Sequence, residues 1–143
     1  MAAGDINAGM IVDLVALAST SSNAGAIWTG GQNDLNVNLV RFDAEDGVAA
    51  HLNDEVDVLI VGIVGTGDIE VDGLCQSLMP GRALIIPRGA RRAITAGAEG
   101  IAYLTCHRRR AGLWPAGLPR ARSGMVLEGG VSDRSSSEGN GSQ

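Results

Sequence analysis

The segment VDVLIVGIVGTGDIEVDG, residues 56–73, decides the fold class. Its first half, residues 56–64, is an almost continuous β-branched and aliphatic run with the length of one strand. In its second half Ile69 and Val71 alternate with acidic residues at positions 68, 70 and 72, which is typical of a half-buried strand. The dipeptide Asp72-Gly73 that ends the segment is a strong signal for a hairpin turn. The segment therefore predicts β-strands joined by tight turns.

The same pattern continues on both sides of this segment. In LNVNLV, residues 35–40, leucine and valine alternate with Asn36 and Asn38, as in a half-buried strand. Segments 82–87, 91–96 and 100–107 are further short apolar runs, separated by turns that contain glycine or proline. Residues 9–18 fit either a strand or a short helix. Regularly spaced short strands predict an all-β sandwich or barrel.

The composition fits a single domain of this kind. The chain has 143 residues, of which 45% are hydrophobic, and a length of this order can bury a sizeable core. The mean hydropathy is +0.13. The 21 glycines favour tight turns over long helices. Among the few aromatic residues, Trp28 and Trp114 are expected to be core or interface anchors.

Charge is distributed unevenly along the chain. Residues 43–72 contain nine carboxylates and no lysine or arginine, whereas residues 82–122 contain nine arginines and one acid, Glu99. The two segments could pair within the fold or across a dimer interface, or they could be two solvated faces of opposite sign. The net charge of −5 argues against nucleic-acid binding.

Two further patterns bear on location. Cys75 and Cys106 are too far apart in sequence for a short metal or redox motif. The apolar run at residues 9–18 has no preceding positive charge and contains Asp13, unlike a signal peptide. No segment has the roughly 18 apolar residues of a membrane span. We therefore expect a cytoplasmic protein with reduced thiols and no membrane partner.

The order of residues around the opening segment resembles that of the cupin superfamily. The first cupin motif is Gly, five residues, His-x-His, three or four residues, Glu, and a later Gly. His51 matches the first His, Asn53 stands at the second, Asp57 matches the Glu, and Gly47 is two residues closer than the pattern. The second motif is Gly, five residues, Pro-x-Gly, two residues, His. It is matched by Gly81, Pro87 and Gly89, with Arg92 where the His would be.

This resemblance implies a small single-domain bacterial cupin with a jelly-roll barrel similar to RmlC, and a homodimer. Residues 26–112 would form the barrel. Residues 1–25 would be an N-terminal arm that adds one strand to it, residues 113–130 a C-terminal arm, and residues 131–143 a disordered tail.

The resemblance also implies a metal position, which in the family is formed by three His and one Glu. The corresponding residues here are His51, Asn53, Asp57 and Arg92. A neutral amide is a poor ligand for transition metals, and a guanidinium has no lone pair to offer. We therefore predict no metal and no other cofactor. If a divalent metal binds, the remaining ligand candidates are His51, Asp57 or Glu55, and His107, with Cys106 as a further candidate.

The same residues predict a binding pocket. In an unbroken strand, His51, Asn53, Glu55 and Asp57 would share one face, which in a cupin is the barrel interior. Arg91 and Arg92 alternate, so one of them faces outward; the motif favours Arg92 inward, where it would need Asp57, Glu55 or an anionic ligand as partner. Tyr103 and His107 share one parity of the last strand. The expected ligand-binding residues are His51, Asn53, Glu55, Asp57, Arg92, Tyr103 and His107.

Three functions are compatible with these residues. The leading hypothesis is a metal-independent cupin that binds a small polar or anionic molecule, with His51 and His107 as candidates for isomerase-like acid–base chemistry. The second is a metal-dependent oxygenase-type cupin that uses His51 with Asp57 or Glu55 and His107. The third is a structural or regulatory dimer with a vestigial cavity. Because one fold hosts many functions, the sequence leaves open whether the protein is an enzyme.

Overall fold

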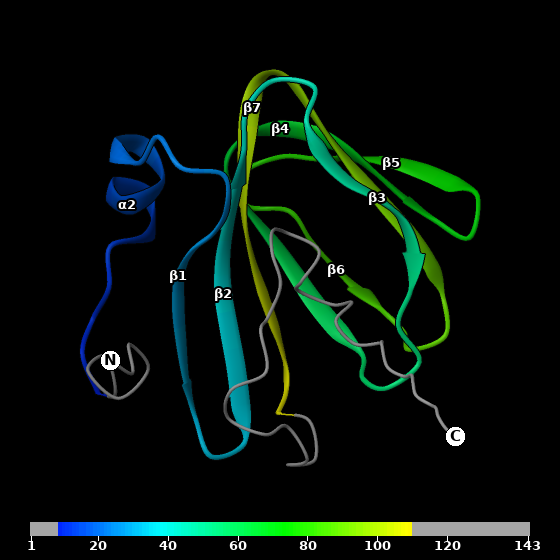
Figure 1. Ribbon diagram of the computed structural model, residues 1–143, viewed down its shortest axis with the longest axis horizontal. Coiled ribbons are helices and arrows are strands. Elements are labelled where there is room, and N and C mark those ends of the chain that lie inside the picture. The colour runs from blue at the N-terminus through cyan, green and yellow to red at the C-terminus, as the bar shows by residue number, and fades with distance from the viewer. Residues whose placement is uncertain (1–8, 110–143) are drawn as a thin grey trace, which may run out of the picture.

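The computed structural model describes residues 9–109 of the chain. Within these residues the elements are one helix followed by strands (Figure 1), in the order α2 (Leu14–Thr20), β1 (Gly25–Gln32), β2 (Leu35–Phe42), β3 (Gly47–Leu52), β4 (Val58–Val71), β5 (Leu74–Leu78), β6 (Ala83–Ile86) and β7 (Arg91–Arg108). All strand pairs are antiparallel. The predicted all-β class is confirmed.

The quoted segment forms β4 and its turn into β5. Val71 pairs with Leu74, so Asp72 and Gly73 are the two residues of the hairpin turn. Both have positive φ, 49° and 87°, as a turn matched to the twist of the strands requires. The predicted hairpin is confirmed.

Two strands are longer than the sequence suggests. Residues 58–71 form one strand, β4, and residues 91–108 form one strand, β7, where shorter strands and a turn at residues 97–100 were expected. The pairing of β4 with β7 shifts register between Gly62 and Val64 and again between Gly65 and Gly67. Irregularities of this kind bend a strand without ending it. The glycine-containing segments are therefore bends inside continuous strands.

Strand β7 connects the two halves of the fold. Residues 101–108 pair with β2, and residues 91–95 pair with β3. The sheet has the order β1-β2-β7-β4-β5, while β3 also pairs with β7 and β6 with β4. In Figure 1, β1 and β2 lie to one side of β7, and β3 and β5 lie to the other. The bent sheet thus brings strands from both halves of the chain around one interior.

The interior is filled by side chains from several strands. Buried residues of β2, β4, β6 and β7 form one apolar cluster, whose members include Val40, Phe42, Val58, Ile60, Ile69, Ile86, Ile94, Ile101 and Tyr103. Burial of these aliphatic and aromatic side chains is the main stabilising contribution to the fold.

The expected N-terminal strand is wrong for the described part of the arm, because residues 14–20 form helix α2. The Asp13 carboxylate accepts a hydrogen bond from the Ala16 N–H (3.0 Å) and caps the helix. Ala18 packs with Leu39 and Ala102 in a second apolar cluster. A short apolar run buried on one side suits a helix as well as a strand, and the Asp13 cap favours the helix.

Replacing Asp13 by alanine is expected to lower the free energy of unfolding by about 1 kcal/mol, because the cap hydrogen bond is lost. Asp13→Asn keeps an acceptor oxygen and should cost clearly less. Chemical denaturation of both variants measures the difference. Equal losses would contradict a capping role for the side chain.

Other expectations concern the ends of the chain and the cysteines. The predicted C-terminal arm and tail lie outside the described residues, apart from the end of β7. Cys75 and Cys106 are free thiols. No helix in residues 9–109 combines the length and apolar character that a membrane crossing needs.

Candidate functional site

Arg92 is the inward member of the arginine pair. It is only 3% exposed, whereas Arg91 is exposed. Its Nε donates to the Ala90 carbonyl (3.0 Å) and its Nη2 to the Pro87 carbonyl (3.4 Å), so the turn that precedes β7 holds the guanidinium. A buried cation held by backbone carbonyls can still attract an anion strongly, because its surroundings screen it poorly.

His51 lies directly opposite Arg92 in the pairing of β3 with β7. Opposite residues of an antiparallel pair have their side chains on the same face, so the His51 ring shares the inward face with Arg92. His51 Nδ1 lies 2.9 Å from the Ala49 carbonyl. A carbonyl only accepts, so Nδ1 carries a proton.

Asn53 does not continue β3, and the expected unbroken strand through residues 51–57 is wrong. Its Oδ1 accepts hydrogen bonds from the N–H groups of Glu55 (2.8 Å) and Val56 (3.4 Å) and so forms a turn. The shared parity predicted for positions 51–57 is therefore lost.

The other end of the Asn53 amide is the most unusual polar group among the described residues. Asn53 is 5% exposed, and its Nδ2 is buried without a hydrogen-bond partner. A buried polar group without a partner costs about 1–3 kcal/mol. The Asn53 carbonyl accepts from the Gly89 N–H (2.7 Å), which joins Asn53 to the turn that also holds Arg92. The backbone of Asn53 and the guanidinium of Arg92 therefore both bind the turn of residues 87–90.

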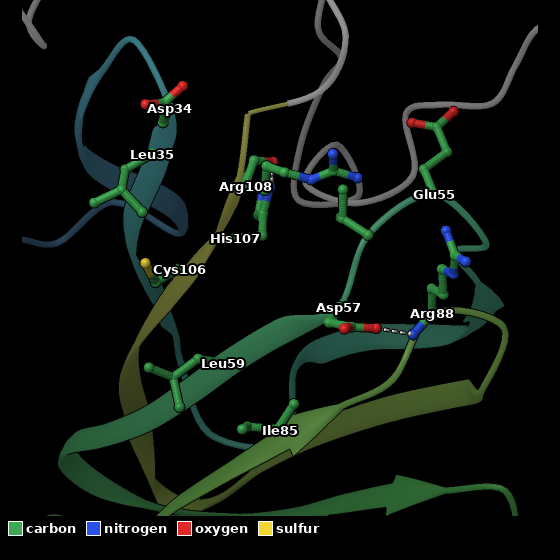
Figure 2. A pocket seen from close by; sticks show the side chains of 11 residues that line it. Asp34, Leu35, Glu55, Asp57, Leu59, Ile85, Arg88, Cys106, His107 and Arg108 are labelled. Atoms are coloured by element: carbon green, nitrogen blue, oxygen red, sulfur yellow. Dashed lines mark hydrogen bonds between the residues drawn. The ribbon is translucent and has the colours of Figure 1, made fainter.

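Glu55 and Asp57 lie outside this buried group. Both are exposed, and the Asp57 carboxylate accepts from the Arg88 N–H (2.8 Å) on the neighbouring turn, as Figure 2 shows. The predicted partnership of Asp57 with Arg92 is replaced by this backbone contact. The break at Asn53 explains the difference, because it turns residues 54–57 away from the line of β3.

His107 belongs to a different set of side chains, at the far end of β7. Its Nδ1 lies 3.0 Å from the Arg108 carbonyl, and its Nε2 lies 3.3 Å from Nδ2 of Asn36. A carbonyl accepts and an amide NH2 donates, so these two contacts select the neutral ring with the proton on Nδ1. Both ring nitrogens of His107 then have hydrogen-bond partners.

These contacts belong to a row of neutral polar side chains that sequence reasoning missed. We define the inner polar row as Thr29, Asn36, Asn38, Thr105 and His107. Asn38 accepts from the Thr29 hydroxyl (2.8 Å), and its Nδ2 lies 3.5 Å from the Thr105 hydroxyl. Asn38, Thr105 and His107 are buried. Only the alternation of Asn36 and Asn38 signalled this row in the sequence, and it normally indicates a solvent-facing side.

The polarity of β2 is thus inverted near its start. Asn38 is buried, and Leu35, on the opposite face, is 52% exposed. Tyr103, expected at the ligand site, instead lies in the apolar core, where its ring centroid is 6.5 Å from that of Phe42. The interior is therefore apolar around Tyr103 and polar towards the ends of β2 and β7.

A groove of about 520 Å³ crosses the ends of β2, β4, β6 and β7 (Figure 2). It combines apolar and charged side chains, and its lining residues are Asp34, Leu35, Glu55, Val56, Asp57, Leu59, Ile85, Arg88, Cys106, His107 and Arg108. Of the expected site residues, Glu55, Asp57 and His107 line this groove. Asn53 and Arg92 instead bind the turn of residues 87–90, and His51 pairs with Arg92 between β3 and β7. The structure thus divides the predicted site between two places.

Comparison with solved structures agrees with this architecture. The TT1209 protein from Thermus thermophilus is superimposable with a TM-score of 0.60 and 19% identity, over 71% of this chain and 98% of that chain. A cupin-2 domain protein from Shewanella frigidimarina has a TM-score of 0.58 and 20% identity, over 69% of this chain and 95% of that chain. KdgF from Halomonas sp. has a TM-score of 0.55 and 20% identity, over 59% of this chain and 77% of that chain. The chain has the cupin fold.

No family model and no curated protein matches the sequence. At 15–23% identity, the cupin structures establish the architecture of this chain but not its activity. The jelly-roll barrel expected from the two sequence motifs is confirmed.

The residues at the cupin metal position do not fit a divalent cation. The Asn53 Oδ1 is engaged by two backbone N–H groups, and its Nδ2 presents hydrogens to its surroundings. Arg92 adds a positive charge, which would repel the ion. The described residues contain no group of three His, Cys, Asp or Glu side chains placed to hold a metal. This position therefore presents donors where a metal would need acceptors.

Proposed function

We propose that this protein is a metal-independent cupin that binds a small anionic molecule at Arg92 and Asn53. The observation that carries the proposal is the unpartnered, buried Nδ2 of Asn53 at the same turn as the buried Arg92 guanidinium. A carboxylate or phosphate oxygen would accept from both groups, and a bidentate contact to the guanidinium would orient the ligand. The desolvated Asn53 amide would then gain the hydrogen bond that it lacks.

His51 supports an acid–base role next to this anion. It lies opposite Arg92 on the same face, and its Nδ1 contact with Ala49 makes Nε2 the nitrogen that would receive a proton. An anion held by Arg92 would also stabilise the resulting imidazolium through its negative charge. Isomerase-like proton transfer is the reaction class that such a pair would serve.

A thermal-shift screen tests the binding proposal with inorganic phosphate, small mono- and dicarboxylates and sugar phosphates as probes. The compound that raises the melting temperature most is then titrated by calorimetry. Arg92→Met should weaken its binding about 10- to 100-fold, because hydrogen bonds to a charged group contribute about 1.5–3 kcal/mol. Arg91→Met, which changes the exposed neighbour, should bind as the wild type does.

Asn53→Asp is the sharper variant, because an aspartate oxygen can keep both turn hydrogen bonds while the Nδ2 donor becomes a negative charge. We expect at least about tenfold weaker binding of the anion with the fold retained. Unchanged affinity in Asn53→Asp and Arg92→Met would refute the site. If no anion binds and Arg92→Met greatly lowers stability, the vestigial-cavity alternative holds instead.

A further inference from the structure

An apolar row crosses the outer face of the sheet, on the side opposite the inner polar row. Cys106 of β7 pairs with Val37 of β2 and with Leu59 of β4, and Leu59 pairs with Ile85 of β6. Ile85 is 67% exposed and Leu59 is 37% exposed. Large aliphatic side chains exposed side by side across neighbouring strands are typical of a surface that another segment covers.

The next row on the same face is already covered. Leu39 is fully buried, and Leu104, its partner on β7, packs with it in the cluster beneath helix α2. The apolar cluster beneath α2 therefore stops one row short of Leu59 and Cys106.

Cys106, Leu59 and Ile85 of this row line one wall of the 520 Å³ groove. Figure 2 shows Cys106, Leu59 and Ile85 following one another across three strands, with Asp57 and Arg88 at the other side. The groove combines this apolar wall with charged groups of both signs.

The end of the described chain lies at this groove. Arg108 lines it, and the Arg109 N–H donates to the carbonyl of Asp34, another lining residue (2.8 Å). The apolar sequence LWPAGL, residues 113–118, begins only four residues later. Five residues can span up to about 17 Å, whereas β6 is two strand spacings, roughly 10 Å, from β7. Trp114 can therefore reach every member of the row.

We propose that residues 113–118 fold back and dock in this groove, with Trp114 against Leu59 and Ile85. Because the segment is tethered to the rim, its effective concentration is millimolar or higher, so a modest affinity keeps it docked. The proposal goes beyond the binding function above and does not depend on it. The competing occupant is a second copy of the chain, as the predicted homodimer would supply.

The two cysteines provide an internal test in the full-length protein. Cys106 lies in the row, whereas Cys75 is exposed on β5. We compare their alkylation rates in the wild type, in Trp114→Ala and in Leu127→Ala, a control that shortens an apolar side chain further along the chain. Trp114→Ala should raise the alkylation rate of Cys106 about tenfold, because about 1.4 kcal/mol of docking free energy would be lost. Cys75 should react equally in all three proteins.

Each other outcome overturns the proposal in a distinct way. If Cys106 reacts equally in the wild type and Trp114→Ala at all protein concentrations, the segment does not cover the groove. If its protection instead increases with protein concentration and survives Trp114→Ala, a second copy covers it. If Leu127→Ala raises the alkylation rate of Cys106 as much as Trp114→Ala does, a later segment than residues 113–118 covers the groove.

Discussion

Tyr103→Ala is expected to lower the free energy of unfolding by about 3–5 kcal/mol, the range for removing a buried aromatic side chain. Tyr103 is among the largest fully buried side chains of the described residues and packs near Phe42 in the main cluster. The cavity left behind would be surrounded by β2, β4 and β7, which cannot collapse independently. Urea denaturation of the variant gives the loss directly.

Tyr103→Phe separates packing from a ligand contact. It keeps the ring in the core and removes only the hydroxyl, so its cost should not exceed about 1.5 kcal/mol. Anion affinity should be unchanged in this variant, because the proposed donors are Arg92 and Asn53. A loss below about 1 kcal/mol in Tyr103→Ala would contradict the central packing role.

Gly65→Ala is expected to cost about 2–5 kcal/mol. Its φ of 76° lies in the left-handed region, which costs an alanine about 1–2 kcal/mol. A Cβ there would also fall against the carbonyl of Gly100 on the paired strand, and overpacking adds about 1–3 kcal/mol. The bulge of β4 against β7 would have to open to admit the methyl group.

Gly73→Ala is the matched control. Gly73 also has positive φ, 87°, but a Cβ at this hairpin turn meets no atom within 4 Å. It should therefore show the conformational cost alone, about 1–2 kcal/mol. Urea unfolding of both variants measures the difference. Similar losses at the two positions would show that the close approach at Gly100 relaxes without cost.

The fold could be predicted further than the site. Alternation at residues 68–72 and the Asp72-Gly73 turn depend on local geometry, and both are confirmed. The continuity of β4 through Gly62 and Gly65 could not be predicted, because a bulge is defined by the partner strand. A short apolar run such as residues 14–20 is equally ambiguous until its burial on one side is known.

The site depends on two local conformations that the sequence pattern does not predict. Asn53 can continue a strand, or its side chain can accept hydrogen bonds from the N–H groups that follow it. The structure has the second conformation, which moves Glu55 and Asp57 out of line with His51. Asn36 and Asn38 match the pattern of a strand whose polar side faces water. They lie on the inner face because Thr29, Thr105 and His107 supply their hydrogen bonds across strands.

The position of β7 has a consequence for how the chain folds during synthesis. It is the last strand of the described residues, and it supplies hydrogen-bond partners to β2, β3 and β4. While the ribosome has produced only β1 to β6, those three strands have unpaired edges, and the core lacks the side chains that β7 contributes. Cooperative folding must then await residue 108, and the nascent chain is most vulnerable to aggregation just before that point.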